Sequence, residues 1–259
     1  MPSLTHAFAR TQIAHLPTPL ERLSRLEAAL ELTTPVYIKR DDCTGMATGG
    51  NKVRQLEFYF GYALEKGATR ILITGAVQSN FVRTAAGFAA RLGLKCTVQL
   101  EDRVAGKDAS YHNSGNVLLD RLFGAEITRF DVGEDEFGAD RSLEAMAQAA
   151  REAGEVPYVI HLSETPRPLG ALGYVVAAEE LLADAERLGI DIGTVVVPSG
   201  SASTHAGTLV GLRAAGRADI RVLGTCVRRL ASEQGPRVQR VCSALETMMG
   251  LPPTVEDAD

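Results

Sequence analysis

The chain lacks the features that mark proteins of nucleic-acid and membrane surfaces. It has no tryptophan, only 5% aromatic residues, and no cluster of lysine and arginine. Its 27 basic and 32 acidic residues leave a net charge of −5. Surfaces that bind nucleic acid or anionic lipid usually gather Lys and Arg in one patch. We therefore expect neither a nucleic acid nor a membrane as a partner.

Cysteines and long hydrophobic runs are also scarce. The four cysteines, at positions 43, 96, 226 and 242, show no C-x-x-C spacing, which favours free thiols in a reducing compartment over disulfides or zinc ligands. The N-terminal residues contain no apolar core of signal-peptide length. The longest apolar stretch begins at Leu169 and reaches Glu179 and Glu180 too soon to span a bilayer. These features predict a cytoplasmic protein.

What the chain does contain is an alternation of strand and helix patterns over its 259 residues, of which 45% are apolar. This length corresponds to one large or two ordinary domains. Strands are expected at 36–42, 70–75, 95–101, 125–130, 157–162, 192–198 and 220–227. Helices are expected at 20–31, 51–67, 81–93, 113–124, 141–153, 173–188, 204–216 and 236–249. The alternation predicts an α/β fold built from parallel βαβ units throughout, with ligands bound at the carboxyl ends of the strands.

The first of the loops at these strand ends is rich in glycine and leads to a lysine. Gly45 and Gly50 have the separation of a P-loop, but Asn51 precedes Lys52 and Val53 replaces the residue that would bind magnesium, so we set that motif aside. Only five of the 27 basic residues are lysines. A helix N-terminus lowers the pKa of an amine and suits a Schiff-base lysine. The pattern also fits a surface lysine after a tight turn.

The second loop runs from residue 74 to residue 80. Gly75 supplies one of the three glycines of a dinucleotide fingerprint, and Glu101 and Asp102 follow about where a ribose-binding acid would stand, so NAD remains an alternative. Ser79 and Asn80 fit helix N-caps. They also fit a helix terminus that holds a carboxylate or an aromatic hydroxyl.

The third loop carries glycine and hydroxyl side chains between a buried strand and a helix. Backbone N–H groups and hydroxyls at such a terminus form a phosphate cradle, although a small-residue turn gives the same pattern. The residues concerned are Ser199, Gly200, Ser201, Ala202, Ser203 and Thr204. The five histidines show no H-x-x-x-H or H-E-x-x-H spacing, and we expect no metal site. No G-x-S-x-G motif indicates an α/β-hydrolase.

Together the three loops resemble one family. The run IKRDDCTGMATGGNKVRQLEF resembles the lysine segment of fold-type-II pyridoxal-phosphate enzymes, and more narrowly that of the ACC deaminase/D-cysteine desulfhydrase family, which includes L-cysteate sulfo-lyase. TGAVQSNFVRTAAGFAARLGL, LGALGY and VVVPSGSASTHAG are similar to further segments of that family. The likeness covers about residues 13–227. It implies a two-domain, three-layer αβα fold with parallel sheets, similar to the tryptophan synthase β chain.

The resemblance also implies roles for single residues. Lys52 would form the Schiff base with pyridoxal 5′-phosphate and later move the Cα proton, and Asn80 would hydrogen-bond the 3′-hydroxyl of the cofactor. Ser79 would hold the substrate carboxylate or assist proton transfer. Residues 199–204 would hold the phosphate. Residues 48–160 would form the small domain, and residues 1–47 with 161–259 the large one. A homodimer is expected.

Departures from the family bear on the substrate. Phe81 stands where relatives often carry His or Gln, beside the substrate site. In the charged loop 163–168, Arg167 is a candidate contact for an anionic group such as a sulfonate, or a solvated loop residue. Family members continue beyond the point that corresponds to Asp259, through segments that carry active-site tyrosines and the partner of the pyridine nitrogen. We therefore expect that this sequence is incomplete.

The expected activity is β-elimination from a small sulfur-containing amino acid, as in D-cysteine desulfhydrase, giving pyruvate and ammonia. L-cysteate sulfo-lyase, ACC deaminase and a non-catalytic pyridoxal-phosphate-binding relative are the alternatives.

Overall fold

The computed structural model describes residues 3–133, 135–163 and 165–255, and it divides into two compact units. Unit 1 contains the chain up to Ala7, the segment Gln12–Gln55, and the chain from Pro166 onward. Unit 2 contains Phe8–Thr11 and Leu56–Thr165.

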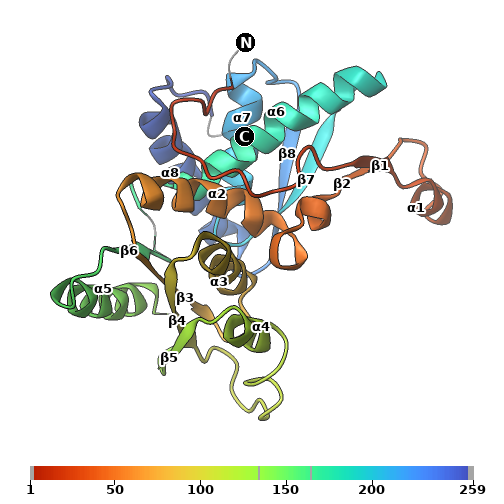
Figure 1. Cartoon of the computed structure of the whole chain (residues 1–259). Coiled ribbons are helices and arrows are strands. Elements are labelled where there is room, and N and C mark those ends of the chain that lie inside the picture. The colour runs from red at the N-terminus through yellow and green to blue at the C-terminus, as the bar shows by residue number, and fades with distance from the viewer. Residues whose placement is uncertain (1–2, 134, 164, 256–259) are drawn as a thin grey trace. The chain divides into compact units, whose positions relative to one another are not determined.

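Unit 2 is built on a four-stranded parallel sheet with the order β5-β4-β3-β6. Its strands are β3 (Arg70–Ala76), β4 (Lys95–Glu101), β5 (Glu126–Phe130) and β6 (Pro157–Ile160). The connecting helices are α3 (Asn80–Leu92), α4 (Asn116–Leu122) and α5 (Glu136–Glu152). Because parallel crossovers are right-handed, α3 and α4 lie on one face of this sheet and α5 on the other (Figure 1).

The unit 2 sheet is held by aliphatic side chains on its faces. Leu72 of β3 and Val159 of β6 pack against Leu143 and Ala147 of α5, and these side chains are almost completely buried. The five middle residues of β3 are buried, as the near-continuous apolar run of a covered parallel strand predicts. The carboxyl end of β3 therefore holds the residues that follow it, 77–80, on a rigid support.

Unit 1 contains a parallel pair of strands, β7 (Thr194–Ser199) and β8 (Arg221–Cys226). Its long helices are α6 (Leu169–Leu188), α7 (Ser203–Ala214) and α8 (Ala231–Met249). Helices α6 and α7 pack so closely that a Cβ atom added at Gly207 would lie 2.1 Å from the carbonyl oxygen of Ala171. That glycine is thus required by packing.

The N-terminal part of unit 1 is a small antiparallel addition. Strands β1 (Leu20–Arg22) and β2 (Tyr37–Lys39) pair with each other, and helix α1 (Ser24–Ala29) lies in the connection between them. Two 3₁₀ turns, Asp41–Thr44 and Met46–Thr48, then lead into helix α2 (Asn51–Glu65), which begins in unit 1 and continues in unit 2.

The α/β alternation predicted from residue 70 onward is confirmed, with differences at the element ends. The expectation of parallel units throughout is wrong for the N-terminal segment, because residues 20–22 form a strand antiparallel to β2 where a helix was expected. The strand expected at 36–42 ends at Lys39, because the Asp41–Thr44 turn is closed by a bond from the Thr44 hydroxyl to the Asp41 carbonyl oxygen. Helix α5 begins earlier than expected because Asp135 caps it, accepting from the Gly138 N–H at 2.8 Å.

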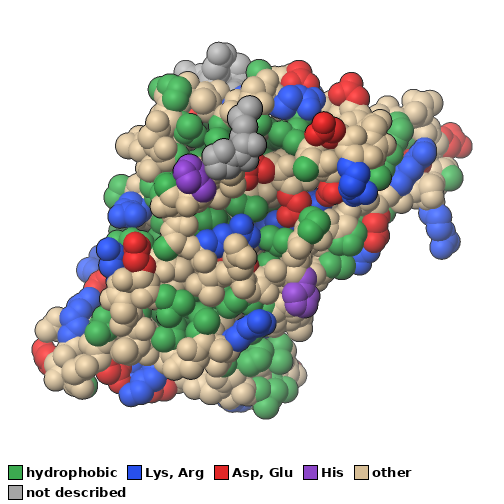
Figure 2. Space-filling view, turned by 45° about the horizontal axis from the view of Figure 1, so that its top comes forward, with side chains coloured by type: hydrophobic (Ala, Val, Ile, Leu, Met, Phe, Trp, Pro, Cys, Tyr) green, Lys and Arg blue, Asp and Glu red, His purple; other side chains and the backbone are tan. Residues whose placement is uncertain are grey.

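Residues 48–55, assigned to the small domain from sequence, belong to unit 1. There Arg54 donates to Asp41 and Glu180, and Gln55 donates to Thr204. The domain assignment itself stays a prediction. Among the described residues, no helix is long and apolar enough to cross a bilayer. On the face drawn in Figure 2, acidic and basic side chains are interspersed.

Candidate functional site

The loop before Lys52 has an unusual backbone conformation. Five of its residues have positive φ angles, between +49° and +108°; they are Gly45, Ala47, Thr48, Gly49 and Gly50. A Cβ atom at Gly49 would lie 2.1 Å from the carbonyl oxygen of Asp42, so this position accepts only glycine. Non-glycine residues in the left-handed region are costly and concentrate at functional sites. The strain marks this loop as a candidate site.

Lys52 follows this loop, in the first turn of α2, and its amine is made partly neutral by its surroundings. Burial lowers the pKa of Lys52 to about 8. Its Nζ donates a hydrogen bond to Oε1 of Gln55 at 3.4 Å. A lowered pKa was expected from the helix terminus, whereas the cause in the structure is desolvation. A lysine of this kind is a competent nucleophile near neutral pH.

Lys52 and most of the hydroxyl-rich loop after β7 line one cavity. This cavity, of about 140 Å³, is lined by Asn51, Lys52, Pro198, Gly200, Ser201, Ala202, Thr204 and Val227. Helix α7 begins here at Ser203, and its N-cap residue Ala202 has a φ of +76° and provides no side-chain cap. The first N–H groups of a helix have no intrahelical partners. This terminus can therefore hold an anion such as a phosphate.

Side-chain hydrogen bonds hold the loop 199–204 against α2. The hydroxyl oxygen of Thr204 accepts from Nδ2 of Asn51 at 3.1 Å and from Nε2 of Gln55 at 3.0 Å. On the other side of the loop, Arg229 donates to the carbonyl oxygen of Gly200 at 3.1 Å. Sequence analysis did not predict these three partners. The loop is thus bonded to side chains of α2 and of the segment between β8 and α8.

Ser199 is placed differently from the rest of the loop. It is buried, it does not line the 140 Å³ cavity, and its hydroxyl lies 3.2 Å from Nδ1 of His205. The hydroxyl oxygen also accepts from Nε2 of Gln234 at 2.9 Å. Its side chain therefore ties the end of β7 to α7 and α8. A phosphate contact by Ser199 stays a prediction.

A buried polar network supports the first turns of α2. Arg54 is only 1% exposed, and it donates to Asp41 at 2.9 Å and to Glu180 at 2.9 Å. The hydroxyl of Tyr174 also donates to Asp41, and burial together with the Asp41 charge raises the pKa of Tyr174 well above its ordinary value. Lys39 completes the network with Glu180 at 2.6 Å.

Sequence analysis missed this network, although Lys39, Asp41, Arg54 and Tyr174 all lie in motifs that it quoted. The available signal was a basic residue two positions after Lys52 in the run GGNKVR. Its carboxylate partner Glu180 lies 126 residues away, which no local pattern reveals.

Ser79, Asn80 and Phe81 lie at the start of α3, in unit 2. Ser79 is the N-cap residue, and its hydroxyl oxygen accepts from the Val82 N–H at 3.3 Å. A Cβ atom at Gly75 would lie 2.8 Å from that oxygen, so glycine is needed where the chain approaches. The ring of Phe81 makes an edge-on contact with Tyr59 at 6.1 Å between ring centroids. The helix-cap reading of Ser79 is thus confirmed, and its ligand-binding role stays a prediction.

The NAD alternative finds no support in unit 2. Glu101 is completely buried, accepts from the Thr74 hydroxyl at 3.0 Å and pairs with Arg103 at 2.8 Å. A carboxylate engaged in this way is not available to a ribose. Within residues 3–133, 135–163 and 165–255, no group of three His, Cys, Asp or Glu side chains could hold a metal ion.

The loop proposed to recognise an anionic substrate is described only in part, because Glu164 lies outside the described residues. Ser163 is held by Asp140, which accepts from its main-chain N–H at 3.0 Å. Arg167 is exposed. Its contact with a substrate stays a prediction.

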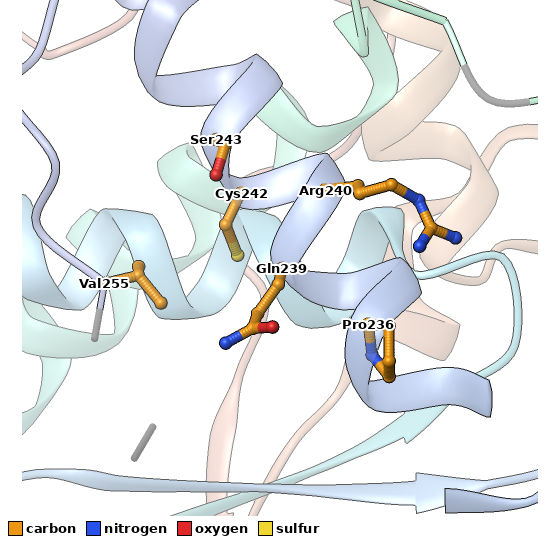
Figure 3. Close-up of a pocket in the computed structure, with 6 residues that line it drawn as sticks. All are labelled: Pro236, Gln239, Arg240, Cys242, Ser243 and Val255. Carbon is orange, nitrogen blue, oxygen red and sulfur yellow. The ribbon is translucent and has the colours of Figure 1, made fainter. Parts of the chain in front are cut away.

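A larger cavity, of about 500 Å³, lies along α8 (Figure 3). Five of its lining residues come from α8, and Val255 comes from the segment after it; they are Pro236, Gln239, Arg240, Cys242, Ser243 and Val255. None of the residues predicted to bind the cofactor or the substrate belongs to this set. Size alone therefore does not locate the candidate site.

The residues around Lys52 fit a phosphorylated aldehyde. A partly neutral amine can condense with a carbonyl group, and the uncapped terminus of α7 in the same cavity can hold a phosphate. The positive φ of Ala202 shapes that terminus. Pyridoxal phosphate carries both chemical groups on one ring.

Comparison with known proteins agrees with this fit. A family model described as pyridoxal-phosphate dependent enzyme matches residues 11–256. The chain is 41% identical over 244 residues to a D-cysteine desulfhydrase of Yersinia pestis (strain Pestoides F), covering 94% of this chain and 72% of that protein. It is 40% identical over 249 residues to a D-cysteine desulfhydrase of Salmonella typhi, covering 96% of this chain and 74% of that protein.

Solved structures give the same result for the fold. The crystal structure of an ACC deaminase homologue superimposes with a TM-score of 0.86 at 32% identity, covering 99% of this chain and 75% of that one. The fold class predicted from sequence, a two-domain αβα fold of type II with parallel sheets, is thereby confirmed. The chain belongs to the family of pyridoxal-phosphate-dependent enzymes.

Proposed function

We propose that this protein is a carbon–sulfur lyase that converts D-cysteine and water into pyruvate, ammonia and sulfide. The observation that carries the proposal is the cavity of about 140 Å³ that is lined both by Lys52 and by residues at the uncapped N-terminus of α7. The choice of D-cysteine is supported by two D-cysteine desulfhydrases that are 41% and 40% identical to this chain.

The loop 199–204 and Lys52 have separate roles in this proposal. Residues 200–204 hold the phosphate through backbone N–H groups and hydroxyls, and Ser199 contributes from the end of β7. Lys52 would hold the cofactor, and its amine would move the proton of the substrate Cα. When bound, pyridoxal phosphate supplies an electron sink that makes this proton acidic. An amine with a pKa of about 8 can both accept and return the proton near neutral pH.

The residues at the start of α3, in unit 2, have proposed roles of their own. Asn80 donates to the ring oxygen of the cofactor, and Ser79 binds the substrate carboxylate or assists proton transfer. Phe81 lies next to them along the chain and gives the substrate side chain an apolar neighbour. These roles rest on the family resemblance and on the exposed position of Asn80.

A substrate panel tests the proposed activity. Sulfide release from D-cysteine, sulfite release from L-cysteate and keto-acid release from ACC are measured at equal concentrations. We expect D-cysteine to react fastest, and faster turnover of either other compound would refute the assignment. Lys52→Ala should abolish activity, whereas Lys66→Ala, at an exposed lysine just after α2, should retain it.

We further propose that the active form is a cytoplasmic homodimer. Free cysteines at positions 43, 96, 226 and 242 support a reducing compartment. The dimer rests on the family resemblance alone. Sedimentation equilibrium tests it, with twice the chain mass of 27.6 kDa as the expected result and the mass of one chain as the contrary result.

A further inference from the structure

The carboxamide of Asn80 has its orientation fixed by two donors. Its Oδ1 accepts from Nη1 of Arg83 at 3.2 Å and from Nδ2 of Asn116 at 2.9 Å. With the amide reversed, its NH₂ group would face both donors. Oδ1 must therefore point toward Arg83 and Asn116. The NH₂ group of this exposed side chain is then the end that can meet a ligand.

Asn116 is itself held firmly, at the N-terminus of α4. Its Nδ2 donates to the carbonyl oxygen of Gln78 at 2.8 Å, and its main-chain N–H donates to Oε1 of Gln78 at 2.9 Å. Its Oδ1 accepts from Nη1 of Arg83 at 3.1 Å. A Cβ atom at Gly115 would lie 2.6 Å from Oε1 of Gln78, so a glycine permits this approach. The loop after β3 and the start of α4 thus form one bonded unit.

Arg83 lies at the base of this arrangement. It is only 7% exposed, and the same Nη1 atom reaches both Asn80 and Asn116. The charge that faces it from α4 is the buried carboxylate of Asp120. Because a guanidinium cannot accept a hydrogen bond, it can only stabilise the carbonyl end of each amide.

We propose that Asn116 is a positioning residue which, with Arg83, presents the Asn80 NH₂ group as a fixed donor to a negatively charged ring oxygen of the cofactor. This inference rests on the proposed function, in which Asn80 contacts that oxygen. A donor held in this direction would favour the deprotonated ring oxygen of the cofactor and would stabilise the negative charge that this oxygen carries at high pH. Asn116 thereby acts on the cofactor without touching it.

The test compares Asn116→Ala with the matched control Asn113→Ala. Asn113 precedes α4 and bonds to Ala109 and Arg121, outside the Asn80 network. For each protein we would measure the dissociation constant of pyridoxal phosphate, the pH midpoint of the spectral change of the bound cofactor, and the thermal midpoint. Asn116→Ser, which keeps a polar side chain, replaces Asn116→Ala if that variant does not fold.

We expect Asn116→Ala to weaken cofactor binding about fivefold, the effect of one lost hydrogen bond, and to shift the spectral midpoint to higher pH. Asn113→Ala should leave both unchanged. A variant with weaker binding or a lower thermal midpoint but an unshifted spectral midpoint would assign Asn116 a merely structural role and overturn the inference. A wild-type protein that takes up no pyridoxal phosphate would refute the proposed function itself, and the inference with it.

Discussion

Lys52 is a lysine whose charged form is destabilised by burial. Burial lowers its pKa to about 8, although the family motif alone does not state how far the side chain is desolvated. The presence of a lysine at a helix start could be read from GGNK, but the cause of the pKa shift could not. Desolvation depends on residues such as Gly200 and Val227, which are distant in sequence and line the same cavity.

The stability of the cofactor-free protein should therefore depend on the charge of Lys52. A folded pKa of about 8 against an unfolded value of about 10.5 means that the folded state carries a desolvated ammonium below pH 8. The cost, about 3 kcal/mol, is relieved as the pH rises from about 8 to about 10.5. Lys52→Met should exceed the wild type in stability at pH 7, with the difference shrinking over that window. Urea unfolding at several pH values measures it, and a pH-independent difference would contradict the assignment.

Asp120 should give the free energy of unfolding the opposite pH dependence. Asp120 of α4 is 1% exposed, burial raises its pKa to about 7, and within the described residues its carboxylate oxygens have no hydrogen-bond partner. In the unfolded chain this carboxyl has the ordinary aspartate pKa of 3.8, so folding becomes less favourable as the pH rises toward 7.

The stability of the wild type relative to Asp120→Asn should therefore fall by about 4 kcal/mol between about pH 4 and about pH 8. Asp191→Asn, which removes an exposed carboxylate, controls for the loss of one charge. Chemical denaturation across this range is the measurement. An unchanged difference would mean that Asp120 is solvated in solution.

At the scale of elements, the loop 45–50 shows how backbone geometry places a functional side chain. Gly49 has a φ of +74° and faces the Asp42 carbonyl, whereas Gly67 has a φ of +71° and would meet no atom within 4 Å if given a Cβ. The two glycines therefore share a similar positive φ and differ in their surroundings. Comparing them separates the cost of a side chain at positive φ from the cost of a steric conflict with the Asp42 carbonyl.

Gly67→Ala should lower the free energy of unfolding by about 1–2 kcal/mol, the cost of a left-handed alanine. Gly49→Ala adds a steric conflict with backbone and should cost more than about 4 kcal/mol or prevent folding. Urea denaturation followed by circular dichroism compares them. Equal losses for the two variants would show that the approach to Asp42 does not constrain this loop.

The elements themselves could largely be predicted from sequence, because the apolar run of β3 and the small-residue start of α7 are local signals. The antiparallel pairing of β1 with β2 could not, since residues 20–22 have no strand pattern of their own. The partners of the site residues were equally hidden. Asn116 bonds to Asn80 across 36 residues, and Gln55 to Thr204 across 149.

At the scale of the whole molecule, the predicted site residues are distributed over both compact units. Lys52 and the loop 199–204 belong to unit 1, whereas Ser79, Asn80 and Phe81 belong to unit 2. The chain crosses between the units within α2, only a few residues after Lys52.

The central claim is that Lys52 carries pyridoxal phosphate. The most direct measurement is the absorption spectrum of the purified protein with added cofactor, followed by borohydride reduction and mass-spectrometric mapping of the labelled peptide. We predict a visible band that is lost on reduction, with the label on Lys52 and on none of Lys39, Lys66, Lys95 and Lys107. A colourless protein, or a label on one of the other four lysines, would contradict it.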